Sequence, residues 1–166
     1  MKKIVLFALL GIVLASCQAN MAQKETKSTA PFSQLSDNQL MDKVQSDALK
    51  YFWDYAEPNS LLGRERYHED NIYPDNDKHV VTTGGSGFGL ATILVGVERG
   101  FIPRKEAVKR LTTMMNFLEK ADRFHGAWSH WINGETGKVV PFGRKDNGGD
   151  LVESAFLTSG ILMVRE

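Results

Sequence analysis

Two carboxylates near the end of the sequence have the type and spacing for acid–base chemistry. Asp150 and Glu153 follow the polar turn Asp146-Asn147-Gly148-Gly149 and open an apolar stretch. In a helix, side chains at positions i and i+3 share a face, and the partial positive charge of the helix N-terminus stabilises carboxylates. The same spacing is close to that of a capping box, in which both side chains only satisfy free backbone N–H groups. We therefore take Asp150 and Glu153 as candidate catalytic residues, with capping as the alternative.

An aromatic loop before this turn has the composition of a carbohydrate-binding surface. Flat indole faces offer apolar area for the C–H surfaces of sugars, and short polar side chains can fix the hydroxyls. The loop spans residues 123–149, and its candidate substrate-binding side chains are Trp128, Trp131, His125 and His130. The alternative for the two tryptophans is a hydrophobic plug under the loop. Arg64, in an earlier charged segment, is a further candidate for substrate binding, although a run of charges is usually a solvated loop.

Metal and phosphate fit these residues less well than sugar does. His125, His130 and Asp150 could ligate zinc, but a His-x4-His spacing on a glycine-containing loop is a weak signal. We expect no metal and no cofactor. A glycine-rich turn at residues 82–89, just before an apolar helix, could hold phosphate. No lysine follows it as in a P-loop, so close backbone packing or a sugar-contacting turn is the better interpretation.

The spacing of apolar residues predicts four helices that would position these side chains. The first and third have one apolar face, whereas the second and fourth are apolar nearly all round and should be buried on all sides. Alternation of amphipathic and buried helices predicts an all-helical fold with two concentric layers. The predicted helices are residues 37–57, closed by Pro58; residues 90–97; residues 104–122, with Pro103 at the first helical position; and residues 150–166.

The last predicted helix has no terminating signal. Residues 161–166 contain no glycine, proline or polar cap. Two wholly apolar helices also need neighbours on every side, which two amphipathic helices cannot supply. We therefore expect a fragment of a longer protein. The alternative is a compact four-helix domain that frays at its end.

The N-terminal residues predict export and lipid attachment. Two lysines, an apolar run and small residues describe a secretory signal that is too short for a comfortable membrane span. Leu14-Ala15-Ser16-Cys17 resembles the lipobox of bacterial lipoproteins, in which the chain is cut before the cysteine and that cysteine is lipid-modified. An ordinary signal peptide, with Cys17 incidental, is the alternative. The expected organisation is a signal peptide at 1–16, a flexible polar tether at 17–36 and a folded part at 37–166, anchored to the bacterial cell envelope without crossing the membrane.

Composition excludes other classes of protein. The 166 residues carry 20 basic and 20 acidic side chains, so the basic surface that nucleic-acid binding requires is absent. Loss of residues 1–16 would remove Lys2 and Lys3 and leave a mildly acidic chain. One cysteine cannot form an internal disulfide.

Several motifs, in order along the chain, resemble the glucoamylase-like domain family, whose members resemble endo-β-1,2-glucanases. The motifs are YFW at 51–53, TGGSGFGLA at 83–91, VERGFI at 97–102, HGAWSHW at 125–131 and NGGDLVESAF at 147–156. The resemblance covers about residues 43–166 and only the N-terminal third of the family. It implies a partial, truncated (α/α)6 toroid, with the family's acidic pair on Asp150 and Glu153 and its aromatic loop on residues 128–131.

The resemblance implies a glycoside hydrolase that acts on a β-glucan, most closely an endo-β-1,2-glucanase. Such hydrolysis needs carboxylates on opposite sides of the scissile bond, about 6.5–9.5 Å apart for inversion and about 5–5.5 Å for retention. Side chains one helical turn apart point the same way, so Asp150 and Glu153 should occupy one side and the opposing carboxylate should lie beyond Glu166. We expect the present chain to be inactive alone. The alternative function is a non-catalytic, glycan-binding surface lipoprotein.

Overall fold

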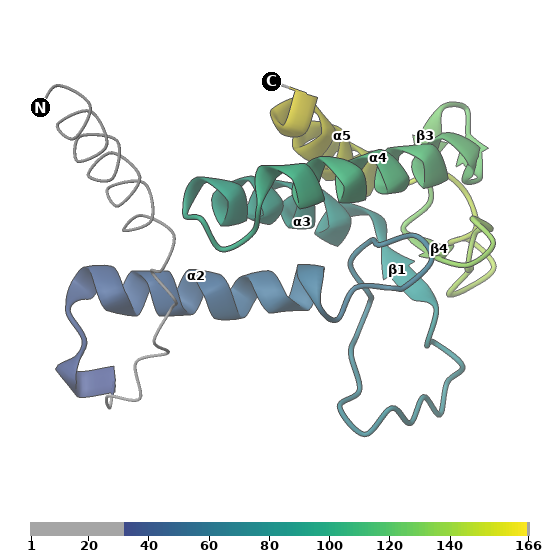
Figure 1. Cartoon of the computed structure of the whole chain (residues 1–166). Coiled ribbons are helices and arrows are strands. Elements are labelled where there is room, and N and C mark those ends of the chain that lie inside the picture. The colour runs from purple at the N-terminus through teal and green to yellow at the C-terminus, as the bar shows by residue number, and fades with distance from the viewer. Residues whose placement is uncertain (1–31, 166) are drawn as a thin grey trace, which may run out of the picture. The chain divides into compact units, whose positions relative to one another are not determined.

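The computed structural model describes residues 32–165, and these fall into two units that divide after Leu35. The predicted signal peptide, Cys17 and most of the predicted tether lie outside the described residues. The first unit contributes only the short 3-10 helix η1 (Phe32–Gln34), at the end of the predicted tether. The second unit carries all other elements. Its helices are α2 (Asp37–Trp53), α3 (Thr83–Glu98), α4 (Arg104–Lys120) and α5 (Leu151–Arg165) (Figure 1).

Helix α2 begins with a complete capping box. The Ser36 hydroxyl accepts a hydrogen bond from the Gln39 amide at 3.4 Å, and the Gln39 side chain accepts one from the Ser36 amide at 2.9 Å. This reciprocal pairing satisfies two free donors at the helix start, with Ser36 as the N-cap. The helix ends at Trp53, before the predicted stop at Pro58, and the chain continues as a long loop to residue 79.

Helix α3 corrects the prediction for the glycine-rich segment. Residues 83–89 form the first two turns of the helix, not a turn that precedes it. Glycine lowers helix propensity but lets another backbone approach closely. A Cβ added at Gly87 would lie 2.3 Å from the Phe156 carbonyl oxygen on α5, and one added at Gly160 would lie 2.4 Å from the Gly87 carbonyl oxygen. Gly87 and Gly160 therefore let the backbones of α3 and α5 pack closely, which agrees with the close-packing interpretation.

Helix α4 has the predicted amphipathic form. Ala107, Met114 and Leu118 are buried, and the basic residues are exposed except Arg110, which is half-buried over the Trp53 ring of α2. Pro103 is the N-cap in extended conformation, one position before the predicted one. Helices α2, α4 and α5 all contact α3, so α3 is the centre of the helical core.

Helix α5 is not buried on all sides, contrary to the prediction. Leu157 and Gly160 are buried against α3, but large apolar side chains on its other faces are exposed. Their exposed fractions are 79% for Leu151, 64% for Val152, 45% for Phe156, 52% for Leu162 and 46% for Met163. The sequence of α5 has the pattern of a fully buried helix. In the described part of the chain, however, α5 packs against neighbours on one side only. Within residues 32–165, no helix combines the length and apolar character needed to cross a membrane.

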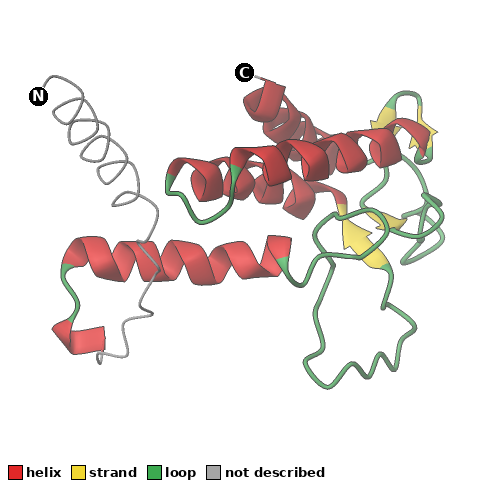
Figure 2. Cartoon of the chain, viewed as in Figure 1, coloured by secondary structure: helices red, strands yellow, loops and turns green. Residues whose placement is uncertain are grey.

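Short strands and long loops gather at the end of the helices where α3 begins (Figure 2). Strand β1 (Val80–Thr82) pairs antiparallel with β4 (Trp131–Asn133), with Thr82 opposite Trp131. Strand β2 (Arg123–Phe124) pairs with β3 (Ala127–Trp128) as a hairpin. The β1–β4 pair leads directly into α3 and therefore fixes the aromatic loop against the N-terminus of that helix.

Candidate active site

Asp150 is the N-cap of α5. Its Oδ1 accepts hydrogen bonds from the amides of Val152 at 2.9 Å and Glu153 at 3.0 Å, and its own amide donates to the Trp128 carbonyl at 2.8 Å. The capping alternative is thus realised for Asp150. It uses only one carboxylate oxygen, since Oδ2 faces the ring of His130, with Nδ1 at 3.3 Å.

Glu153 does not complete a capping box. Its Oε2 accepts a hydrogen bond from the Gly84 amide at 2.7 Å, across to the first turn of α3. A Cβ at residue 84 would lie 2.5 Å from that oxygen, so glycine is what admits the carboxylate. The free N–H group at the start of α3, which could have bound phosphate, is therefore occupied by a side chain of the protein.

The structure brings His130 together with both carboxylates. Its Nε2 lies 4.0 Å from Glu153 Oε1, in addition to the contact between Nδ1 and Asp150. The side chains of Asp150, Glu153 and His130 remain 29%, 18% and 34% exposed, so the cluster is accessible from solvent. Two carboxylates and an imidazole on one accessible surface can exchange protons and bind hydroxyl groups.

Trp131 borders this cluster. Its ring stacks on His130 with centroids 4.3 Å apart and an interplanar angle of 18°, and Phe142 lies on it at 4.9 Å. Trp131 is half-buried and, through His130, adjoins the carboxylates, and its contact with a sugar stays a prediction.

The contacts of Trp128 match the alternative interpretation, in which its side chain is a hydrophobic plug under the loop. Its indole N–H donates to the Leu118 carbonyl at 3.2 Å, and the ring packs against the buried core. The Trp128 backbone exchanges hydrogen bonds with the Ser154 hydroxyl at 2.9 and 3.2 Å. These contacts tie the aromatic loop to α5, and a sugar contact of Trp128 stays a prediction.

His125 lies at the tip of the β2–β3 hairpin. It has φ 51° and is followed by Gly126 with φ 93°, as a tight turn with two left-handed residues requires. The exposed ring contacts Phe124 edge-on, and the described contacts do not join it to Asp150 or Glu153. Its role in binding likewise stays a prediction.

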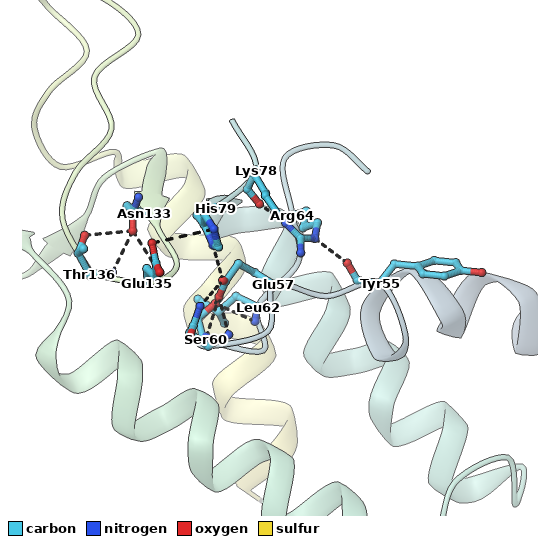
Figure 3. Close-up of polar contacts among 11 residues, drawn as sticks. Tyr55, Glu57, Ser60, Leu62, Arg64, Lys78, His79, Asn133, Glu135 and Thr136 are labelled. Atoms are coloured by element: carbon cyan, nitrogen blue, oxygen red, sulfur yellow. Dashed lines mark hydrogen bonds and ion pairs between the residues drawn. The ribbon is translucent and has the colours of Figure 1, made fainter. Parts of the chain in front are cut away.

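Arg64 belongs to a separate contact network (Figure 3). The residue is only 8% exposed, and its guanidinium donates to the carbonyls of Tyr55, at 2.9 Å, and of Lys78. These two bonds hold the long loop between α2 and β1 together. If Arg64 binds substrate, it must do so through the N–H groups of the guanidinium that do not donate to Tyr55 and Lys78.

A buried carboxylate that the sequence did not single out, Glu57, belongs to the same loop between α2 and β1 as Arg64 (Figure 3). Glu57 has no exposed surface, and it accepts hydrogen bonds from the amides of Asn59 and Ser60 and from the Ser60 hydroxyl, at 2.7–3.0 Å. His79 Nδ1 lies 2.9 Å away. Burial alone raises the pKa of Glu57, but the hydrogen bonds from Ser60, His79 and Asn59 outweigh it and leave the pKa below its ordinary value. A single glutamate before a proline carries no periodic signal, which is why the sequence did not reveal it.

Among residues 32–165, no group of three or more histidine, cysteine, aspartate or glutamate side chains is placed to hold an ion.

Comparisons with known proteins point to enzymes of β-1,2-glucan degradation. No family model matches the chain. It is 50% identical over 150 residues to the exo β-1,2-glucooligosaccharide sophorohydrolase of Parabacteroides distasonis, across 90% of this chain and 19% of that protein.

Solved structures give the same picture. The endo-β-1,2-glucanase from Chitinophaga pinensis, in complex with sophorotriose and glucose, is 59% identical over 79% of this chain and 31% of its own, with a TM-score of 0.76. The β-1,2-glucanase from Parabacteroides distasonis is 51% identical over 79% of this chain and 18% of its own, with a TM-score of 0.72. The chain thus spans about a fifth to a third of the length of these relatives. Its helices form part of an (α/α)6 toroid, and the chain is a homologue of the glucoamylase-like β-1,2-glucanases.

Proposed function

We propose that this protein is a glycoside hydrolase that cleaves β-1,2-linked glucan, with Asp150 and Glu153 as acid–base groups of its active site. The observation that carries the proposal is the orientation of the acid pair. Each carboxylate has one oxygen held by a helix N-terminus and the other facing His130, in a partly exposed cluster that Trp131 borders. The names of the homologous enzymes support β-1,2-glucan as the substrate class.

The geometry also sets a condition on the mechanism. Asp150 and Glu153 both contact the same imidazole ring, so they approach a bound sugar from one side. Hydrolysis by inversion or retention needs a carboxylate across the scissile bond. The proposal therefore includes a further carboxylate, opposite the acid pair, to complete the reaction.

The test is hydrolysis of linear β-1,2-glucan by the protein expressed from its complete gene. The unaltered protein should release sophorooligosaccharides, and Asp150→Asn and Glu153→Gln should each lower kcat at least about 100-fold, the usual range for loss of an acid–base group. Asp146→Asn, which changes an exposed carboxylate in the preceding turn, serves as the comparison. Full activity in both the Asp150 and the Glu153 variants would refute the assignment. Tight binding of the glucan without any product would instead select the non-catalytic glycan-binding lipoprotein.

We also propose that the protein is a lipoprotein of the bacterial cell envelope, attached through Cys17. The support is the lipobox-like sequence Leu14-Ala15-Ser16-Cys17 after a lysine-initiated apolar run. Mass spectrometry of the N-terminal peptide should find diacylglycerol on Cys17. Cys17→Ser should release the protein from the membrane fraction, and an unmodified Cys17 in membrane-free protein would contradict the anchor.

A further inference from the structure

His130 lies between the two carboxylates of the acid pair, and both of its ring nitrogens face them. Nδ1 is 3.3 Å from Asp150 Oδ2, and Nε2 is 4.0 Å from Glu153 Oε1. The second oxygen of each carboxylate is occupied by backbone amides, those of Val152 and Glu153 for Asp150 and that of Gly84 for Glu153. The remaining oxygen of each carboxylate therefore has the imidazole as its neighbour.

The ring is itself held in place by the scaffold. It stacks on Trp131, and the carbonyl of His130 accepts a hydrogen bond from the Thr83 amide at 3.1 Å, at the start of α3. The Thr83 hydroxyl donates to the Ser129 carbonyl at 2.6 Å. The backbone on both sides of the imidazole is thus fixed to α3, the helix that also binds Glu153.

We infer that His130 is a positioning residue that holds the free oxygens of Asp150 and Glu153, and that it does so instead of binding glucan through its ring nitrogens. The inference rests on the proposed function of the acid pair. A neutral imidazole donates through one nitrogen, whereas an imidazolium donates through both. In either form the nitrogens are directed to carboxylates and one ring face is covered by Trp131, which leaves little of the ring for a sugar.

The experiment uses three substitutions in the protein expressed from its complete gene. His130→Phe keeps the stacking on Trp131 and removes both donors. His130→Asn can place an amide N–H close to the position of Nδ1, and His130→Gln can place one close to that of Nε2. His68→Phe is the matched control, since His68 lies edge-on against Tyr73 with centroids 4.7 Å apart, in the loop between α2 and β1.

A positioning role predicts a loss in kcat with little change in KM. His130→Phe should lower kcat about 100-fold and leave KM within about 3-fold, because interactions needed only in the transition state are lost. His130→Asn should recover about 10-fold of that loss, more than His130→Gln, since the contact to Asp150 is the shorter of the two. His68→Phe should match the unaltered protein. A rise in KM at unchanged kcat in His130→Phe would overturn the inference, because it would identify His130 as a sugar contact.

A double substitution separates this inference from the proposed function. If His130 acts through Glu153, His130→Phe should cost much less in a Glu153→Gln background than in the unaltered protein. Full additivity of the losses both in this background and in an Asp150→Asn background would contradict the inference while leaving the hydrolase assignment intact. Absence of hydrolysis by the unaltered protein would refute the proposed function itself, and the inference with it.

Discussion

At the level of single residues, the acid pair depends on the absence of a side chain at position 84, where the residue is glycine. Gly84 donates its amide to Glu153 at 2.7 Å, and the space of its absent Cβ is filled by the carboxylate. The atom that a methyl group would displace is the end of a flexible side chain, which can move without disturbing the backbone. Position 84 therefore affects the direction of Glu153 more than the stability of the fold.

We predict that Gly84→Ala lowers activity without destabilising the protein. The new Cβ displaces Glu153 from the α3 amide, so kcat should fall at least about 10-fold. The gain in helix propensity, about 1 kcal/mol at most, should keep Tm within a few degrees. Gly143→Ala, at a position with open space around the missing Cβ, is the control. A large fall in Tm with Gly84→Ala would show that the site is rigid and would contradict the argument.

The sequence predicted the two carboxylates of the candidate site but not the residues that they contact. Asp150 and Glu153 were visible from spacing because both lie on one helix. The partner of Glu153 is Gly84, 69 residues away, and Thr83 binds the loop 46 residues away. Such long-range contacts depend on the packing of α3 against α5, which no local pattern specifies. For the same reason the spacing left open whether Asp150 is a helix cap or an acid. In the structure one oxygen of Asp150 caps α5 and the other faces His130.

At the level of elements, Glu57 links its own turn to His79 and, through His79, to the segment after β4. It binds the turn at Asn59 and Ser60, and His79 before β1. The His79 carbonyl then accepts a hydrogen bond from the Gly134 amide at 2.6 Å, just after β4. The buried carboxylate of Glu57 therefore helps to hold the β1–β4 pair, which carries Trp131, in place through His79.

We predict that Glu57→Gln destabilises the protein at neutral pH by about 2–4 kcal/mol, because an amide cannot accept all the hydrogen bonds of the carboxylate. The folded pKa of Glu57 is lowered, so its charge contributes stability above the unfolded pKa, near 4.5, and the contribution is lost as pH falls through the lower folded value. The difference in unfolding free energy between the two proteins should accordingly shrink below about pH 4.5.

The control for Glu57 is Glu135→Gln. Glu135 is 55% exposed at the side chain and lies 4.0 Å from His79, so its removal should change stability little at any pH. Urea unfolding from pH 3 to pH 7 measures both variants. A difference for Glu57→Gln that stays constant over this range would contradict the role given to its charge.

The close contact of α3 with α5 gives a second prediction for elements. Gly160→Ala would place a Cβ 2.4 Å from the Gly87 carbonyl oxygen and 2.9 Å from the Gly87 Cα. These are backbone atoms, so the helices must separate, and we expect a loss of about 1–3 kcal/mol. Ser159→Ala, one residue earlier at an exposed position, should be neutral. Equal stability of the two variants in thermal unfolding would show that the helix pair has room to adjust.

The helical spacing of apolar residues predicted the four α-helices of the described chain and their order, but not the start of α3. Four glycines in residues 83–89 favour a turn by local propensity. Tertiary packing overrides that preference here, because Gly87 and Gly160 allow the two backbones to touch. Helix α4, in contrast, was predicted well because its apolar face is set by a pattern within the helix itself.

At the level of the whole molecule, the helices leave an apolar surface open. Phe88 on α3 is 58% exposed and lies 5.3 Å, centroid to centroid, from Phe156 on α5. Leu162 and Met163 extend the surface along α5. A connected apolar surface of this kind is a site of association when nothing covers it.

We predict that the chain without residues 1–16 self-associates when it is produced by itself. Its exposed apolar surface should bind a hydrophobic dye, and light scattering should show oligomers at micromolar concentration. Replacing Leu162 with Lys and Met163 with Gln should reduce both signals and leave the helical circular dichroism unchanged. Val108→Lys, at an apolar side chain that is 52% exposed on α4, is the control and should change neither. A monomer that unfolds cooperatively at a concentration-independent temperature would contradict the prediction, because it would mean that the surface formed by α3 and α5 needs no partner.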